Sequence, residues 1–316
     1  MLSYVCRRIW ALIPTLFVVS AAVFLVVYLI PGGPATALLG LEAEPSAVAA
    51  LNAELGFDRP FLTQYADWLV RALRGDWGQS FFLRMPVLSA LREYFGPTLS
   101  LAVLAQCVAL LIALPLGIAA AYRHGTFFDA ATVSASLLGT AMPGFLLSFF
   151  LMLFFGLSLR WLPVAGYAPL SRGLAEHLRY LLLPALSLGM VQAAYITRMS
   201  RSALLDVLHS GYIRTARAKG LSETAVLLVY GLKNAAPTVL TVAGQSFGSL
   251  LTGTIVTETI FGIPGLGMLT MGAISRRDVF VIQGVALFVA LIYVLVNLAV
   301  DLLCAFVDPR IQLGRR

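Results

Sequence analysis

The sequence predicts an all-α integral membrane protein with six transmembrane helices. Of its 316 residues, 59% are hydrophobic and only 12% are charged, and the mean hydropathy is +0.89, which is too apolar for a soluble chain of this length. Six windows lack Asp, Glu, Lys and Arg and hold roughly 18 residues or more, enough for a helix to cross a hydrocarbon core of about 30 Å. The windows are Ile9–Leu41, Tyr94–Tyr122, Ala130–Leu159, Tyr180–Thr197, Asn234–Thr257 and Val279–Val300.

The first window is expected to be an uncleaved span. Arg7 and Arg8 precede it, and residues 35–37 resemble the cleavage site of a secretory signal. The apolar part of such a signal holds about 7 to 15 residues, whereas the apolar run 9–30 is long enough to cross the bilayer. We therefore expect this segment to stay in the protein as its first transmembrane helix.

The segment that follows the first window is predicted to be structured. Pro60 is typical of a helix start, and residues 75–78 predict a turn. The apolar residues between them recur at helical spacing, and they are Phe61, Tyr65, Trp68, Leu69 and Ala72. Two roles stay open for this helix: packing on the membrane surface or the helix bundle, and contact with a partner outside the membrane.

The basic residues predict that both ends of the chain are cytosolic. With that orientation, twelve of the 22 basic residues lie in short inner segments, and the other ten are spread over longer outer loops that also carry many acids. The twelve are Arg7, Arg8, Arg123, Arg198, Arg201, Arg214, Arg217, Lys219, Lys233, Arg310, Arg315 and Arg316. Anionic lipid headgroups account for the formal charge of +7, so no nucleic-acid partner is expected.

Prolines and glycines mark irregular places within the apolar regions. Pro115, Pro143 and Pro184 lie inside predicted spans and are expected to kink them. A further uncharged window, 259–275, contains the sequence GIPGLG and cannot be one continuous helix. We expect this window to form a loop or a re-entrant segment.

A basic segment between two windows, 198–236, contains the most informative pattern in the chain. Tyr212–Lys219 predicts a short helix with apolar residues three apart on one side and arginines three apart on an adjacent side. Gly220 is expected to end this helix in a left-handed conformation, and Ser222 is expected to cap a second helix. The result is a rigid basic helix-turn-helix in the cytosol, small enough to fit a groove in a partner.

The few polar residues of the spans have either a functional or a structural interpretation. They are Gln106, Gln192, Gln245, Glu258, Asn297 and Asp301. A carboxylate within a membrane is a functional candidate because burying it unpaired is costly, but a structural ion pair or interhelical hydrogen bond explains these residues equally. The three cysteines and three histidines have no metal-binding spacing, and no GxxxxGK[ST] phosphate loop occurs. We therefore expect no metal, no cofactor and no nucleotide hydrolysis in this chain.

Several segments together resemble the inner-membrane permeases of ATP-binding-cassette importers, in the dipeptide, oligopeptide and nickel branch. The resemblance extends from residue 1 to about residue 311, and the motifs occur in the same order as in that family. The motifs are RRIWALIPTLFVVS, LGFDRPFLTQYADWL, GYIRTARAKG, LKNAAP, ETIFGIPGLG, RRDVFVIQG and VNLAVDLLCAFVDPRI. The general permease signature has a glutamate and two alanines where this chain has Arg214, Thr215 and Ala216, a departure that is common in the peptide branch.

The resemblance implies a type I importer permease fold and a role as a transport subunit, with no enzymatic activity of its own. It implies three regions: residues 1–97 with the first span and the outer segment, 98–306 as a five-helix core with a cytosolic coupling loop at 198–236, and 307–316 as a cytosolic tail. The coupling helix that docks on an ATPase would comprise Tyr212, Ile213, Arg214, Thr215, Ala216, Arg217, Ala218, Lys219 and Gly220.

The implied partners are a second permease subunit, two ATPase subunits that bind ATP, an extracytoplasmic solute-binding protein and the lipids of the bacterial inner membrane. Short peptides are the cargo that the resemblance favours, and nickel, metal chelates and glutathione remain alternatives. A secondary transporter driven by ions is the main rival from another class, and a membrane-embedded enzyme is a third. The spans contain neither a midplane carboxylate relay nor a nucleophile and base pair, which both rivals would need.

Overall fold

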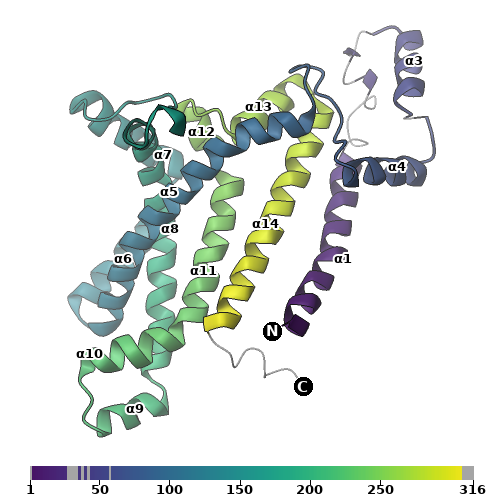
Figure 1. Ribbon diagram of the computed structural model, residues 1–316. Helices are drawn as coiled ribbons and strands as arrows, with labels where there is room; N and C mark the ends of the chain where they lie inside the picture. Colours follow the sequence, from purple (N-terminus) through teal and green to yellow (C-terminus); the bar gives the residue numbers. More distant parts are fainter. Residues whose placement is uncertain (1, 27–34, 37–38, 41–42, 57, 308–316) are drawn as a thin grey trace. The chain divides into compact units, whose positions relative to one another are not determined.

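A computed structural model describes residues 2–26, 35–36, 39–40, 43–56 and 58–307, and this part of the chain is helical without any extended β-strand (Figure 1). The helices, in chain order, are α1 Leu2–Val26, α3 Pro45–Leu55, α4 Phe61–Leu73, α5 Val87–Tyr122, α6 Phe127–Ala141, α7 Gly144–Leu151, α8 Leu174–Leu208, α9 Gly211–Ala218, α10 Glu223–Ala225, α11 Leu232–Gly253, α12 Ile255–Phe261, α13 Leu266–Arg276 and α14 Val279–Val307. Two π-helical segments, Met152–Ser158 and Val226–Gly231, extend α7 and join α10 to α11. The all-α prediction is confirmed.

The chain forms two compact units, each of which is described by itself. The large unit comprises residues 1–5, 99–263 and 295–316, and the small unit comprises residues 6–98 and 264–294. Both α5 and α14 contribute residues to the two units.

Four continuous helical segments in the described residues are long and apolar enough to cross a membrane, by length and composition alone. They are α5, α8, the segment Glu223–Gly253 that ends with α11, and α14. Two broken helix pairs, α6 with its continuation through α7 and α12 with α13, raise the number to six if each pair is one span. The described apolar stretch of α1, Leu12–Leu25, is shorter, and the remainder of the first predicted window includes residues outside the described part of the chain.

The third predicted span consists of two helices joined by a sharp bend at Pro143, where a kink was expected. The chain bends by 99° between α6 and the helical segment Gly144–Ser158. Met142, the residue between α6 and Pro143, has extended backbone angles of φ −77° and ψ 125°. A residue before proline is pushed out of the helical region by the proline ring, which is why Pro143 breaks the helix. In contrast, α5 and α8 continue through Pro115 and Pro184.

The fifth predicted window is also interrupted, because α11 ends at Gly253 and a separate short helix, α12, follows it. The prediction that residues 259–275 cannot form one helix is confirmed. Gly262 ends α12 with a left-handed φ of 63°, and α13 begins only at Leu266. A side chain at position 262 would strain this turn.

Small residues allow the helices of the large unit to approach one another closely. A Cβ atom added to Gly189 of α8 would lie 2.8 Å from the carbonyl oxygen of Ala105 of α5. One added to Gly244 of α11 would lie 2.1 Å from a methyl group of Val300 of α14. Close contact through small residues is typical of helices that associate inside membranes, where dispersion and interhelical hydrogen bonds replace the hydrophobic effect.

The small unit joins the beginning of α5 to α13 and the beginning of α14, and it also contains α4 packed against α1. Phe24 of α1 contacts the rings of Phe61, Tyr65 and Trp68 of α4, with centroids 5.4 to 5.5 Å apart. The hydroxyl groups of Ser20 and Tyr65 are 2.7 Å apart. The predicted helix after Pro60 is confirmed, since α4 begins directly after that residue and lies across the end of α1 (Figure 1).

Candidate functional site

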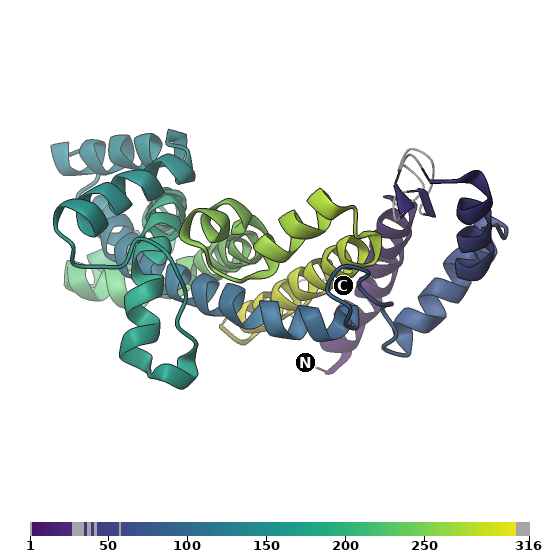
Figure 2. The same cartoon turned by 90° about the horizontal axis from the view of Figure 1, so that it is seen from above.

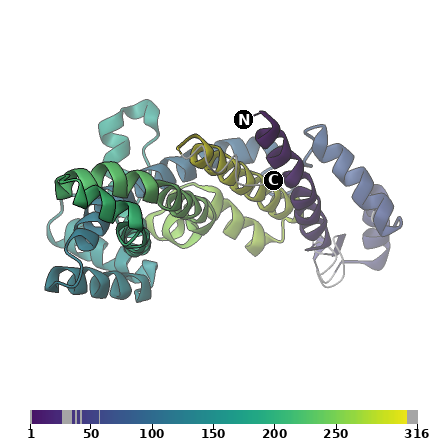
Figure 3. The same ribbon diagram turned by 90° about the horizontal axis from the view of Figure 1, so that it is seen from below.

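The predicted helix-turn-helix is present and lies at one end of the large unit. Figures 1 and 2 place the segment 159–173 at the opposite end of this unit, and Figure 3 shows α9 and α10 from below. The predicted helix Tyr212–Lys219 is confirmed to within one residue as α9. Gly220 has the predicted left-handed conformation, with φ +79°, and its N–H donates to the Arg217 carbonyl at 2.9 Å. The Ser222 hydroxyl accepts a hydrogen bond from the Ala225 N–H at 3.3 Å, as a helix cap does.

The two apolar residues of α9 are buried within the chain itself. Ile213 and Ala216 form a cluster with Val226 of the following π-helical segment, and Leu208 of α8 packs against them. Because the chain itself covers them, these two residues are not available to a groove in a partner. An apolar pair at i and i+3 packs against the nearest apolar surface, and here the chain supplies that surface directly after the turn.

Arg217 is exposed, and it braces the turn through an ion pair with Glu223. Its Nε donates to Glu223 Oε1 at 2.8 Å, and its Nη2 donates to Glu223 Oε2 at 3.1 Å. This bidentate pair crosses the loop at Gly220 and fixes its geometry. The exposed residues of α9 and the turn form the surface that a partner would meet, and they are Gly211, Tyr212, Arg214, Thr215, Arg217, Ala218, Lys219 and Gly220.

A buried ion pair holds the beginning of α6 against α8, and sequence analysis missed it. Asp129 is buried, and both of its oxygens accept hydrogen bonds from the guanidinium group of Arg201; the Nη2 to Oδ2 distance is 2.7 Å. His124 Nδ1 and the Gly125 N–H lie 3.0 and 3.1 Å from the same Oδ2. The Thr126 hydroxyl caps α6 by accepting from the Asp129 N–H. The threonine and the aspartate three residues later were a visible sign of a helix start.

Two of the polar residues singled out in the sequence hold helices together, and a third accepts a hydrogen bond from the cap of its own helix. Gln106 of α5 donates from Nε2 to the Ala243 carbonyl of α11 at 3.2 Å and accepts from the Ser246 hydroxyl at 3.2 Å. Gln192 of α8 donates to the Ser249 hydroxyl of α11 at 2.7 Å. Glu258 is fully buried and accepts from the Thr254 hydroxyl at 2.8 Å. Hydrogen bonds of this kind favour the structural interpretation of these side chains.

The other three polar residues differ in exposure. Asn297 and Asp301 are half-buried on α14, and each has an interaction partner. Gln245 of α11 is exposed, and within the described part of the chain it has no hydrogen-bond partner.

The exposed residues of α11 include no apolar side chain, although the helix is long enough to span a membrane. They are Lys233, Asn234, Thr238, Thr241, Gln245, Ser249, Thr252 and Gly253. Six of them recur at intervals of three and four residues within an arc of about 80° at 100° per residue, which defines the polar face of α11. Its members are Asn234, Thr238, Thr241, Gln245, Ser249 and Thr252.

Other helices of the large unit expose side chains suited to lipid. Leu111 and Leu116 are exposed on α5, and Leu295, Leu303 and Phe306 are exposed on α14. Gln245 is the amide of this face without a hydrogen-bond partner among the described residues, and leaving it in hydrocarbon would be costly. The polar face of α11 is therefore suited to water, cargo or another polar helix. The spacing of these residues is visible in the sequence, but only the structure shows that they are exposed together.

Comparison with known proteins shows the family to which the chain belongs. The family described as binding-protein-dependent transport system inner membrane component matches residues 113–313, and its N-terminal family matches residues 1–102. A Sinorhizobium fredii protein named "Probable peptide ABC transporter permease protein" is 39% identical over 309 residues, which cover 98% of this chain and 99% of that protein. A glutathione transport system permease of Salmonella typhimurium is 40% identical over 312 residues, with 99% of both chains covered.

A solved structure has the same fold. A chain of the MetNI methionine ABC transporter, in an inward-facing conformation, matches with a TM-score of 0.57 and 19% identity, covering 69% of this chain and 96% of that one. Fold and sequence together define a multi-pass inner-membrane permease of the type I importer class. The chain belongs to the family of binding-protein-dependent transport system inner membrane components, the permease subunits of ABC importers.

Proposed function

We propose that this permease forms half of a translocation path for short peptides and that the polar face of α11 is its wall. The observation that carries the proposal is that the most exposed side chains of α11 are all polar, although α11 makes up most of a helical segment long enough to span a membrane. Hydroxyl and amide groups donate and accept hydrogen bonds, as peptide bonds do, without selecting for charge. A second permease subunit would supply the facing wall.

The names of the relatives support peptides as the cargo class. The relatives named above are a peptide transporter permease and a glutathione permease, and glutathione is itself a small peptide. Glutathione therefore remains the first alternative cargo, and nickel or metal chelates follow it. The polar face of α11 contains no carboxylate, imidazole or thiol, the groups that transition metals prefer as ligands, which favours an organic cargo.

The α9 hairpin, which comprises α9, the turn at Gly220 and α10, is the proposed contact with an ATPase. Both ends of the chain then lie in the cytosol. Two ATPase subunits would bind ATP, and an extracytoplasmic binding protein would deliver cargo. Because Ile213 and Ala216 fix α9 to the segment that leads into α11, movement of α9 on ATPase closure is transmitted to α11. Rotation of α11 then changes the access of its polar face from one side of the membrane to the other.

Cysteine accessibility tests the path. Cys6, Cys107 and Cys304 are first replaced by serine, and Gln245→Cys is introduced into the assembled transporter. A charged, membrane-impermeant thiol reagent should label this cysteine, and saturating cargo should slow the labelling. Leu111→Cys, on an exposed apolar face, is the matched control and should react slowly with or without cargo. Equal labelling rates at the two positions, with no effect of cargo, would refute the assignment of the path to α11.

A further inference from the structure

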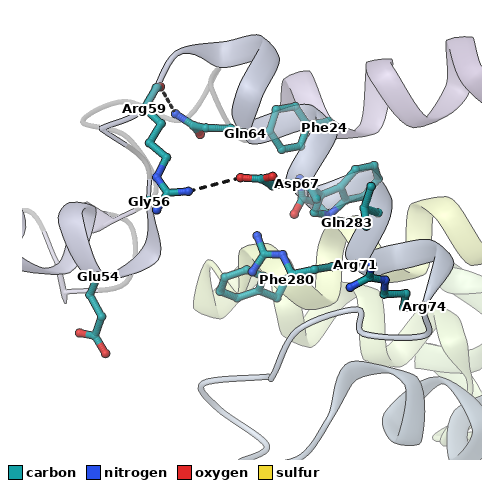
Figure 4. Close-up of a pocket in the computed structure, with 12 residues that line it drawn as sticks. Phe24, Glu54, Gly56, Arg59, Gln64, Asp67, Arg71, Arg74, Phe280 and Gln283 are labelled. Atoms are coloured by element: carbon teal, nitrogen blue, oxygen red, sulfur yellow. Dashed lines mark hydrogen bonds and ion pairs between the residues drawn. The ribbon is translucent and has the colours of Figure 1, made fainter.

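The small unit contains a cavity of about 490 Å³ that no part of the transport mechanism uses (Figure 4). The cavity lies between α4, the end of α3 and the beginning of α14, and Phe24 of α1 contributes to its lining. Arg59, Arg71 and Arg74 all line this cavity. Three arginines around one cavity indicate an anionic ligand.

Two of the three arginines are available to such a ligand. Arg59 pairs with Asp67, with 3.4 Å between Nη1 and Oδ2. Arg71 and Arg74 have no ion pair within the described residues. The remaining acid of the lining, Glu54, points away from both of them in Figure 4.

A buried amide adds a second, independent sign of a missing ligand. Gln283 lines the same cavity and is only 5% exposed, and its Nε2 donor has no hydrogen-bond partner. Buried donors in proteins are nearly always paired, so an unpaired one adjoining a cavity indicates an acceptor that the isolated chain does not supply. An amide donor and two guanidinium groups together match the several oxygens of a phosphate.

The depth of the cavity identifies the source of the phosphate. The charge-free part of α1 begins at Ile9, and Phe24 follows it by fifteen residues, or about 22 Å along a helix. On the predicted first span, Phe24 therefore lies in the far part of a hydrocarbon core of about 30 Å, counted from Ile9. Helix α4 packs directly on Phe24, exposes Leu62 at 76% and Leu73 at 80%, and carries Trp68. Exposed leucines, interfacial aromatic residues and arginines are typical of a helix that lies at the headgroup boundary.

We propose that this cavity binds the phosphate group of a phospholipid from the leaflet at this end of α1. Arg71 and Arg74 donate to the phosphate oxygens, and the Gln283 side chain lies beside them in the lining. The acyl chains extend beside the exposed leucines of α4. With the N terminus in the cytosol, as proposed above, this is the outer leaflet. The lipid thus fastens the outer helix to the membrane boundary.

Native mass spectrometry of the purified complete transporter tests the proposal. The delipidated complex is titrated with phosphatidylglycerol. In the double variant Arg71→Gln/Arg74→Gln, the dissociation constant of the most tightly bound phosphatidylglycerol should rise about tenfold or more. The charge-conserving variant Arg71→Lys/Arg74→Lys should keep most of the affinity. Arg92→Gln, which alters an exposed arginine of the same unit outside the cavity, is the matched control and should bind as the parent does.

Three outcomes would overturn the proposal. Unchanged lipid affinity in Arg71→Gln/Arg74→Gln contradicts it directly. Inorganic phosphate that binds as tightly as phosphatidylglycerol, and displaces it, assigns the cavity to a free anion. Lost affinity for the solute-binding protein with unchanged lipid binding assigns the arginines to an acidic protein surface. Melting temperatures of all variants are measured in parallel, so that a folding defect is distinguished from a binding defect.

Discussion

Asp129 and Arg201 form a buried bidentate ion pair that joins the first turn of α6 to α8, across a sequence separation of 72 residues. The Asp129 side chain is 6% exposed and that of Arg201 is 18% exposed, so little water screens the pair. Both α5 and α8 pack beside this site, because Gly117 of α5 approaches the backbone of Thr197. The pair therefore fixes α6 against α8, close to α5, at the end of the large unit that carries α9.

Breaking the pair should destabilise the protein strongly. Asp129→Asn leaves Arg201 without its carboxylate partner, and the loss of one member of a buried pair costs about 3 to 5 kcal/mol. The melting temperature of the purified permease in detergent should fall accordingly. Glu176→Gln removes the exposed pair with Arg172 and should change stability by less than about 1 kcal/mol. Similar losses in the two variants would show that the Asp129 pair is no more important than a surface contact.

Gly220→Val should impair coupling more than folding. A Cβ atom at this position would meet no atom within 4 Å, so the cost comes only from the left-handed φ of +79° and amounts to about 1 to 2 kcal/mol. Membrane insertion and pairing with a second permease should persist, while ATPase co-purification and uptake fall together. Gly220→Asn, which tolerates this conformation better, should retain more of both. A well-expressed Gly220→Val variant with normal uptake would remove the role assigned to this turn.

Ile213→Ala should loosen the α9 hairpin. Truncating a fully buried isoleucine typically costs about 2 to 5 kcal/mol, and here the loss falls on the small cluster that holds α9 to the chain. Limited trypsin digestion should cut faster at Arg214 and Lys219, because the loosened helix fits a protease more readily. Thr215→Ala, on the exposed side of the same helix, should leave the cleavage rate unchanged. Parent-like cleavage of Ile213→Ala would contradict the packing described for this residue.

Reporter fusions should locate the α9 hairpin in the cytosol and the outer segment on the other side of the membrane. The prediction follows from the density of basic residues in the short loops. A reporter inserted within 210–223 should behave as cytosolic, and one inserted within 43–55 should behave as external. A reporter at residue 215 that behaves as external would exclude both the orientation and the ATPase contact.

Features set by neighbouring residues could be predicted from the sequence. Charge-free windows locate α5, α8, α11 and α14, and apolar spacing locates α4. The α9 hairpin could also be predicted, because its stop at Gly220 and its cap at Ser222 depend on local backbone geometry.

Features that depend on distant residues could not be predicted. The i, i+3 pattern showed that Ile213 belongs to an apolar face, but it did not show that the face packs against Val226. The partner of Asp129 lies 72 residues away, so only the fold identifies it. The size of the bend at Pro143 depends on how α7 packs after the break, and a proline alone indicates only that the helix is interrupted.

Three of the four hydroxyl groups on the polar face of α11 already donate to carbonyls of the helix that carries them. Thr241 donates to the Pro237 carbonyl at 2.8 Å, Ser249 to that of Ser246 at 2.8 Å and Thr252 to that of Ser249 at 3.1 Å. Such a surface loses little when water leaves it, because its donors keep their partners. On the proposed path, the wall can therefore alternate between a hydrated and a dry state at low cost. Gln245 is the residue whose amide most needs a new partner when the water has gone.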